Sequence, residues 1–139
     1  MQRKFDAILL VDDDQATNYL HELYIKEWGI TENIYATLNG QEALDFLTGN
    51  EEFQQFRRSL ILLDINRPVM NGFEFLEAYE KLDEKYKGAI VVVMLTSSLH
   101  TQDQTRAKQL SELSGYINKP LCEERMMEIL DSIQVVNVK

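Results

Sequence analysis

Several features are scarce in this chain, and each scarcity excludes a class of protein. Of 139 residues only Cys122 is a cysteine, so no internal disulfide can form and a disulfide scaffold is excluded. The longest unbroken apolar run, residues 89–95, is far too short to span a membrane. The first apolar stretch stops at Asp12 and shows no export signal. With only 2 prolines and 6 glycines, the composition favours an ordered, thiol-bearing cytoplasmic protein.

Basic residues are also scarce relative to acidic ones. The chain has 14 Lys and Arg residues against 23 Asp and Glu residues, a formal net charge of −9 at pH 7. This surplus argues against nonspecific binding to nucleic acid or anionic lipid. We expect one domain over residues 1–139, with its core at about 6–133, a polar insert at 51–58 and a short tail at 134–139. We expect no nucleic-acid partner and no membrane partner.

Short apolar runs recur along the chain with helix-like stretches between them. The runs predict strands at residues 7–11, 33–37, 60–63, 90–95 and 116–118, of which the second is placed by spacing as much as by pattern. Runs that are apolar at successive positions are typical of strands buried on both faces of a parallel sheet. Alternation of strands with helices predicts an α/β sandwich that carries helices on both faces.

The helix-like stretches carry apolar residues at spacings of three and four positions, which is typical of a helix with one buried face. The expected buried faces are Leu20, Leu23 and Tyr24 within 15–28; Ala43, Leu44 and Leu47 within 40–48; Leu76, Tyr79 and Leu82; Ala107, Leu110 and Leu113; and Met126, Met127, Leu130 and Ile133. We expect Asp14 to cap the first helix, Gly49 to stop the second and Asn71 to cap the third. His21 has no second ligand type near it in the sequence, so a surface position is expected.

Polar residues follow the predicted strands. Asp12 and Asp13 follow the first, Asp64 the third, Thr96 the fourth and Lys119 the fifth. Because the carboxyl ends of parallel strands meet at one edge of a sheet, we expect these side chains to converge. Clustered carboxylates repel one another unless a cation lies among them, and Mg²⁺ prefers such oxygen ligands.

A carboxylate beside that cation can attack phosphorus and form an aspartyl phosphate. The charge that develops on the phosphoryl group needs hydrogen-bond donors, and Lys119 and the Thr96 hydroxyl are of the right type. The residues therefore predict phosphoryl-transfer chemistry at this edge of the sheet.

Together, residues 8–14, 62–72, 94–98 and 115–120 resemble the receiver (CheY-like) domain of two-component response regulators. The resemblance extends from about residue 6 to residue 133, with the motifs in family order. It implies a stand-alone receiver with a three-layer, flavodoxin-like fold, in which five helices flank a five-stranded parallel sheet of order 2-1-3-4-5.

The resemblance also implies the roles of the acidic residues. Asp64 matches the phosphoacceptor. Asp12 and Asp13 match the acidic pair that, with Asp64 and the main-chain carbonyl of Asn66, binds Mg²⁺, or Mn²⁺ in its place.

The remaining motif residues match the switch of the family. Thr96 matches the hydroxyl that turns toward the phosphoryl group, and Lys119 the lysine that pairs with it. Pro120 matches a proline that usually follows a cis peptide bond. Tyr116 matches the aromatic that moves inward. Arg67 stands where the family often has an apolar residue.

The implied function is signalling rather than metabolic catalysis. A sensor histidine kinase or a histidine phosphotransfer protein would donate the phosphoryl group, and a protein–protein contact with a downstream target would be the output. Self-phosphorylation from small phosphodonors and slow self-dephosphorylation are expected, with the protein a monomer or a phosphorylation-dependent dimer.

Competing functions fit the sequence less well. A haloacid-dehalogenase-type phosphatase requires Thr or Val where this chain has Ala16, and three aspartates in the first loop would repel the phosphate of FMN. No P-loop motif is present. A degenerate receiver that acts only as a binding module is disfavoured by the complete set of motif residues.

Overall fold

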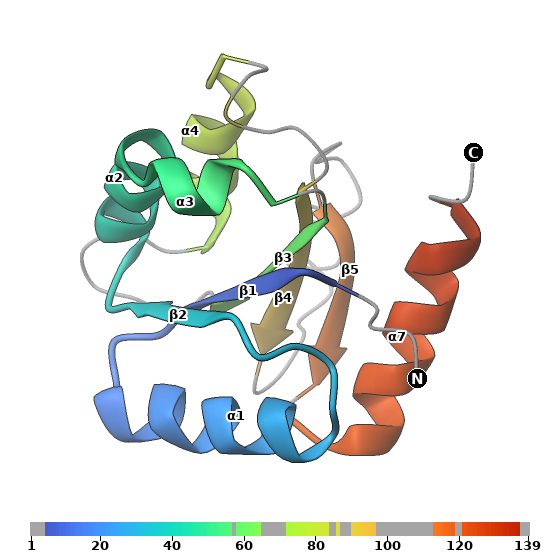
Figure 1. Ribbon diagram of the computed structural model, residues 1–139. Coiled ribbons are helices and arrows are strands. Elements are labelled where there is room, and N and C mark those ends of the chain that lie inside the picture. The colour runs from blue at the N-terminus through green and yellow to red at the C-terminus, as the bar shows by residue number, and fades with distance from the viewer. Residues whose placement is uncertain are drawn as a thin grey trace.

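A parallel sheet with strand order β2-β1-β3-β4-β5 forms the centre of the computed structural model (Figure 1). The structure describes residues 5–56, 58–64, 72–83, 86, 90–96, 113–118 and 121–136. The strands are β1 (Ala7–Val11), β2 (Ile34–Thr37), β3 (Ser59–Asp64), β4 (Ile90–Thr96) and β5 (Leu113–Asn118). All neighbouring strands pair in parallel, so the expected five-stranded sheet and its order are confirmed.

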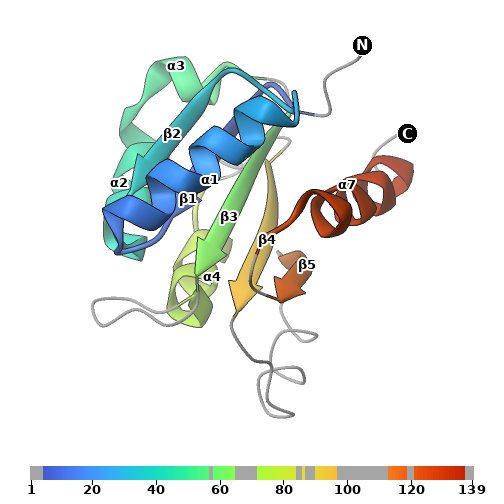
Figure 2. The ribbon, with the colours of Figure 1, turned by 90° about the horizontal axis from the view of Figure 1, so that it is seen from below.

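Helices cover both faces of this sheet. On one face lie α1 (Gln15–Glu27) and α7 (Glu123–Val136), and on the other lie α2 (Gly40–Gly49), α3 (Glu51–Gln54) and α4 (Gly72–Glu80) (Figures 1 and 2). The three-layer α/β sandwich is therefore confirmed. The predicted helix around Ala107 and Leu110 lies outside the described residues.

Alternate residues of the central strands supply two separate cores. Leu9 of β1 packs in the cluster that contains Leu47 of α2 and Tyr79 of α4. The next residue, Leu10, packs in the cluster on the opposite face, with Ile25 of α1. Every residue of β1 is buried, as the apolar run predicted for a strand covered on both faces.

The buried face of α1 differs from the prediction. Leu20 and Leu23 were expected in the core, but each is 44% exposed, whereas Asn18, His21 and Ile25 are buried. His21 is only 8% exposed, so the expected surface position is wrong as well. The apolar pattern selected the wrong face because the buried Asn18 side chain donates hydrogen bonds to the carbonyls of Asp12 and Thr37. A pattern of apolar residues does not reveal such a buried polar side chain.

Several strand boundaries also differ from the prediction. β5 begins at Leu113, so assigning that residue to a preceding helix is wrong. Leu113 pairs with Val92, and the register between β4 and β5 shifts directly afterwards, which obscures the apolar pattern at the start of this strand. β3 and β4 end on Asp64 and Thr96 themselves, one residue later than predicted.

The polar insert at 51–58 contains the short helix α3. Asn50 closes α2 and also caps α3, because its Oδ1 accepts the backbone N–H of Phe53 at 2.8 Å. Phe53 is 1% exposed and packs edge-on against Tyr35 and Phe46, which fastens the insert to β2 and α2. Gly49 is the last residue of α2, so Asn50 and not this glycine ends the helix.

The remaining helices largely follow their predicted apolar faces. Ala43 and Leu47 are buried in α2, and Met126 and Leu130 in α7. α7 continues to Val136, three residues into the expected tail. Among the described residues, none of the helices is both long enough and apolar enough to cross a membrane.

Candidate functional site

The strand register brings the predicted acidic residues to one edge of the sheet. Val11 of β1 is the Cα partner of Leu63 in β3, and Asp12 and Asp64 are the residues that follow this pair. Adjacent strands lie only about 4.8 Å apart, so the backbones of Asp12 and Asp64 are neighbours at the carboxyl ends of the two strands. Figure 2 shows that this end of β3 points the same way as the ends of β4 and β5.

The same register continues toward the other edge of the sheet. Asp64 pairs with Leu95, so Thr96 lies one residue further along β4. Thr96 pairs in turn with Asn118, the last residue of β5. Lys119 is next in sequence but lies outside the described residues, as do Asn66, Arg67 and Pro120. Tyr116 lies within β5, opposite Met94.

Asp12 and Asp13 occupy different environments although they are adjacent. Asp12 is 5% exposed, and its Oδ1 accepts the backbone N–H of Asp14 at 3.0 Å. Asp13 is exposed. A buried carboxylate is retained only where donors or a cation compensate for its lost hydration. The pair therefore offers the buried carboxylate of Asp12 and the solvent-exposed carboxylate of Asp13.

Asp14 serves the helix rather than the acidic pair. Its Oδ1 accepts the backbone N–H of Ala16 at 3.0 Å, and its Oδ2 accepts the Thr17 hydroxyl at 2.9 Å. These hydrogen bonds, the Thr17 hydroxyl first, hold the pKa of the Asp14 carboxyl below its ordinary value. The predicted N-cap of α1 is confirmed.

Asn18 is the residue at this site that sequence reasoning missed. Its side chain, 4% exposed, donates from Nδ2 to the carbonyl of Asp12 at 3.0 Å and to the carbonyl of Thr37 at 3.2 Å. The available signal was its position, because Asn18, His21 and Ile25 recur at helical spacing on one face of α1.

The donor set fits a hard divalent cation. Two adjacent carboxylates, one buried and one exposed, can contribute oxygen ligands while leaving room for water, as Mg²⁺ requires. Asp12 and Asp13 would hold the ion beside the backbone position of Asp64. Among the described residues, no three His, Cys, Asp or Glu side chains gather to hold a metal ion, at this edge or elsewhere.

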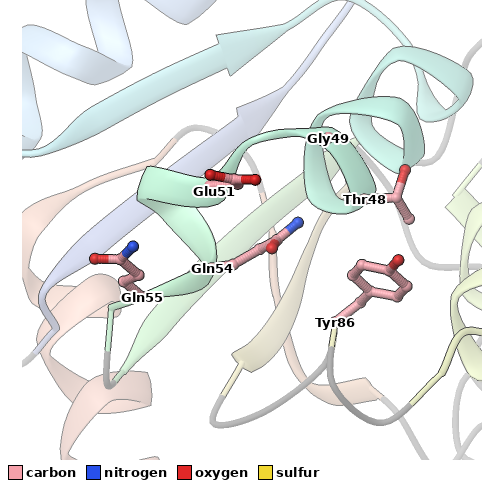
Figure 3. A pocket seen from close by; sticks show the side chains of 6 residues that line it. All are labelled: Thr48, Gly49, Glu51, Gln54, Gln55 and Tyr86. Carbon is pink, nitrogen blue, oxygen red and sulfur yellow. The ribbon is translucent and has the colours of Figure 1, made fainter.

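A cleft lies at the opposite end of the sheet from the acidic residues. It has a volume of about 530 Å³ and is lined by Thr48, Gly49, Glu51, Gln54, Gln55 and Tyr86 (Figure 3). These residues belong to the end of α2, to α3 and to the segment before β4. The cleft therefore lies toward the amino-terminal ends of the strands and contributes nothing to the acidic site.

A family model described as the response regulator receiver domain matches residues 8–131. The chain belongs to this family. It is thus a receiver domain of the two-component response regulators, which are signalling proteins, and the resemblance inferred from its motifs is confirmed.

Individual relatives agree with this assignment. The receiver is 30% identical to response regulator Rcp1 of Synechocystis over 92% of its own length and 86% of that protein. A two-component response regulator from Cytophaga hutchinsonii superimposes with a TM-score of 0.82 at 28% identity, covering 96% of this chain and 99% of that one. The probable transcriptional regulator ycf29 of Porphyra purpurea is 28% identical over 95% of the chain, which spans 61% of that relative's length.

Proposed function

We propose that this receiver takes a phosphoryl group onto Asp64 from a phosphohistidine of a sensor kinase or a phosphotransfer protein. The observation that carries the proposal is the pairing of Val11 with Leu63, which makes the backbones of Asp12 and Asp64 neighbours at one edge of the sheet. The buried Asp12 and the exposed Asp13 then supply the oxygen donors of a cation site beside the acceptor.

The transfer requires few groups. A carboxylate oxygen of Asp64 forms a bond to phosphorus as the phosphorus–nitrogen bond of the donor breaks, and the electron pair of that bond leaves with the imidazole. Asp12, Asp13, Asp64 and the main-chain carbonyl of Asn66 would hold Mg²⁺. When bound, Mg²⁺ supplies positive charge that offsets the charge of the phosphoryl oxygens.

Donors from the neighbouring strands complete the proposed site. Thr96 pairs with Asn118 in the sheet, and Lys119 is the next residue in the sequence. We assign the Thr96 hydroxyl and the Lys119 ammonium to the phosphoryl oxygens, where fixed donors stabilise charge. In this scheme Tyr116 would follow the movement of Thr96, and Pro120 would direct Lys119 toward the phosphoryl group.

The output is a change of surface. Contacts that form only with the phosphoryl group shift a two-state equilibrium between inactive and active surfaces, and a few kcal/mol are sufficient. A downstream protein in the cytoplasm binds the active surface. The receiver acts as a monomer or as a phosphorylation-dependent dimer. Water then hydrolyses the acyl phosphate slowly, which resets the protein. Residues 1–139 act as one receiver domain in this scheme.

Labelling with acetyl phosphate tests the proposal. With Mg²⁺ present, the chain gains the mass of one phosphoryl group, and Asp64→Asn abolishes that gain. Asp45→Asn, which changes an exposed carboxylate of α2, is the matched control and keeps full labelling. Unchanged labelling of Asp64→Asn would place the acceptor elsewhere and overturn the proposal.

A further inference from the structure

Asn18 links two strands at the acidic site without taking part in the chemistry proposed above. It lies on the buried face of α1. Its Nδ2 donates to the carbonyl of Asp12, at the end of β1, and to the carbonyl of Thr37, at the end of β2. One side-chain amide thus joins the carboxyl ends of two neighbouring strands to the helix that follows the first of them.

The hydrogen bonds fix which way this amide faces. Both of its partners are carbonyl oxygens, so only the NH₂ group can face them. The Oδ1 atom then faces away, and it is buried with no hydrogen-bond partner in the part of the chain that is described. An unpaired buried acceptor is unfavourable for folding. Asn18 is therefore poorly explained as a device for stability alone.

The carbonyl that Asn18 holds has a special place. It belongs to the peptide group that joins Asp12 to Asp13, so fixing its direction fixes the plane from which both carboxylates extend. The surrounding backbone is held as well. The N–H of Asp12 donates to the Thr37 carbonyl at 3.2 Å, and the N–H of Asn18 donates to the Asp14 carbonyl at 3.1 Å.

We propose that Asn18 is a positioning residue, which holds the Asp12–Asp13 peptide so that the two carboxylates are arranged for a divalent cation. This inference rests on the proposed function, because that function places the cation at the acidic pair. Asn18 touches neither the cation nor the reacting atoms. Its contribution is pre-organisation, so its loss should change metal affinity more than stability.

Thr31 offers a matched comparison at the other end of β1. Its hydroxyl donates to the carbonyl of Asp6 at 2.8 Å, and the side chain is 2% exposed. Thr31→Val therefore removes a buried side-chain hydrogen bond to the backbone leading into β1, at the end away from the acidic pair. A purely structural role for Asn18 predicts that the two positions behave alike.

The experiment measures the Mg²⁺ dissociation constant by titration calorimetry, and the melting temperature in parallel, for the full chain and its variants. Asn18→Ala is expected to weaken Mg²⁺ binding about tenfold, as is typical when a residue that orients metal ligands is lost. Thr31→Val is expected to leave the affinity unchanged despite a lower melting temperature. Asn18→Leu fills the space and removes the unpaired Oδ1, so it should melt higher than Asn18→Ala yet bind Mg²⁺ as weakly.

The outcomes separate this inference from the proposed function. Wild-type affinity in Asn18→Leu or Asn18→Ala overturns the positioning role while labelling at Asp64 stands. Equal losses of affinity in Thr31→Val and Asn18→Ala also overturn it, because they indicate a general effect of destabilisation. If the unmodified chain neither binds Mg²⁺ nor takes the label, the proposed function fails and the inference fails with it.

Discussion

Val11 and Leu63 are Cα partners in the adjacent parallel strands β1 and β3, so the residues that follow them, Asp12 and Asp64, lie side by side at the carboxyl ends of those strands. Neither residue is near the other in sequence, and the sheet alone makes them neighbours. Asp12 is buried and Asp13 is exposed. The negative charges of these adjacent carboxylates repel each other, which favours binding of a cation between them.

Asp13→Ala is expected to weaken Mg²⁺ binding about tenfold or more without unfolding the receiver. The side chain is exposed, so no packing is lost, and removing its charge relieves repulsion with Asp12. Titration calorimetry gives the affinity, and thermal unfolding without metal gives the stability. Asp45→Ala on α2 should change neither. Mg²⁺ affinity that survives Asp13→Ala would show that the cation is held elsewhere.

Thr96→Ala should separate phosphorylation from its output. In the proposed transfer the reacting group is Asp64 with the cation, so labelling by acetyl phosphate should remain largely intact. The surface change should be blunted because a donor to the phosphoryl group is missing. Amide chemical shifts recorded with beryllofluoride report that change, and Thr48→Ala is the control at an exposed hydroxyl. Wild-type shifts in Thr96→Ala would contradict the switch role.

The N-cap of α1 should make stability depend on pH through Asp14. Hydrogen bonds from Thr17 and Ala16 hold its folded pKa below the unfolded value, so this contribution is fully present above the unfolded pKa. It is lost as the pH falls through the folded pKa. The urea midpoint of the unmodified chain should exceed that of Asp14→Ala at neutral pH, and the gap should narrow in acid. A gap that does not change with pH would mean that the carboxylate charge contributes nothing.

Phe53→Ala is expected to lower the free energy of unfolding by about 3 to 5 kcal/mol, the usual loss for a buried aromatic side chain. Phe53 is 1% exposed and contacts the rings of Tyr35, Phe46 and Phe56. Urea unfolding measures the loss, and Phe53→Leu should lose less. Because α3 lies away from the acidic residues, Mg²⁺ affinity should not change. A fall in affinity would indicate that the insert is coupled to the site.

Most helices and strands were predictable from the pattern of apolar residues, and the strand order was predictable from the family resemblance. Continuous apolar runs predicted the central strands, and the spacing of Ala43 and Leu47 predicted the buried face of α2. The face of α1 was not predictable in this way. Asn18 and His21 are buried there. Only the folded chain shows that the Asn18 amide donates to backbone carbonyls at the ends of two strands. Likewise Leu113 could not be assigned to β5, because the register shift that places it is a property of strand pairing.

The composition of the acidic site was predictable to a similar extent. Asp12 and Asp64 were inferred as neighbours from the rule that strand ends meet, and the backbone register agrees. The unequal burial of Asp12 and Asp13 was not inferred, since it depends on the path of the chain between the end of β1 and the start of α1. Predictions about Asn66, Lys119 and Pro120 lie outside the described residues and stay predictions.

Mapping the phosphoryl group to a single residue tests the central claim most directly. Borohydride reduces an aspartyl phosphate to homoserine, so peptide mass spectrometry after labelling with acetyl phosphate and Mg²⁺ identifies the acceptor. The account predicts reduction at position 64 alone, with none when Mg²⁺ is removed by chelation. Reduction at Asp12, Asp13 or any other carboxylate, with Asp64 unmodified, would contradict it.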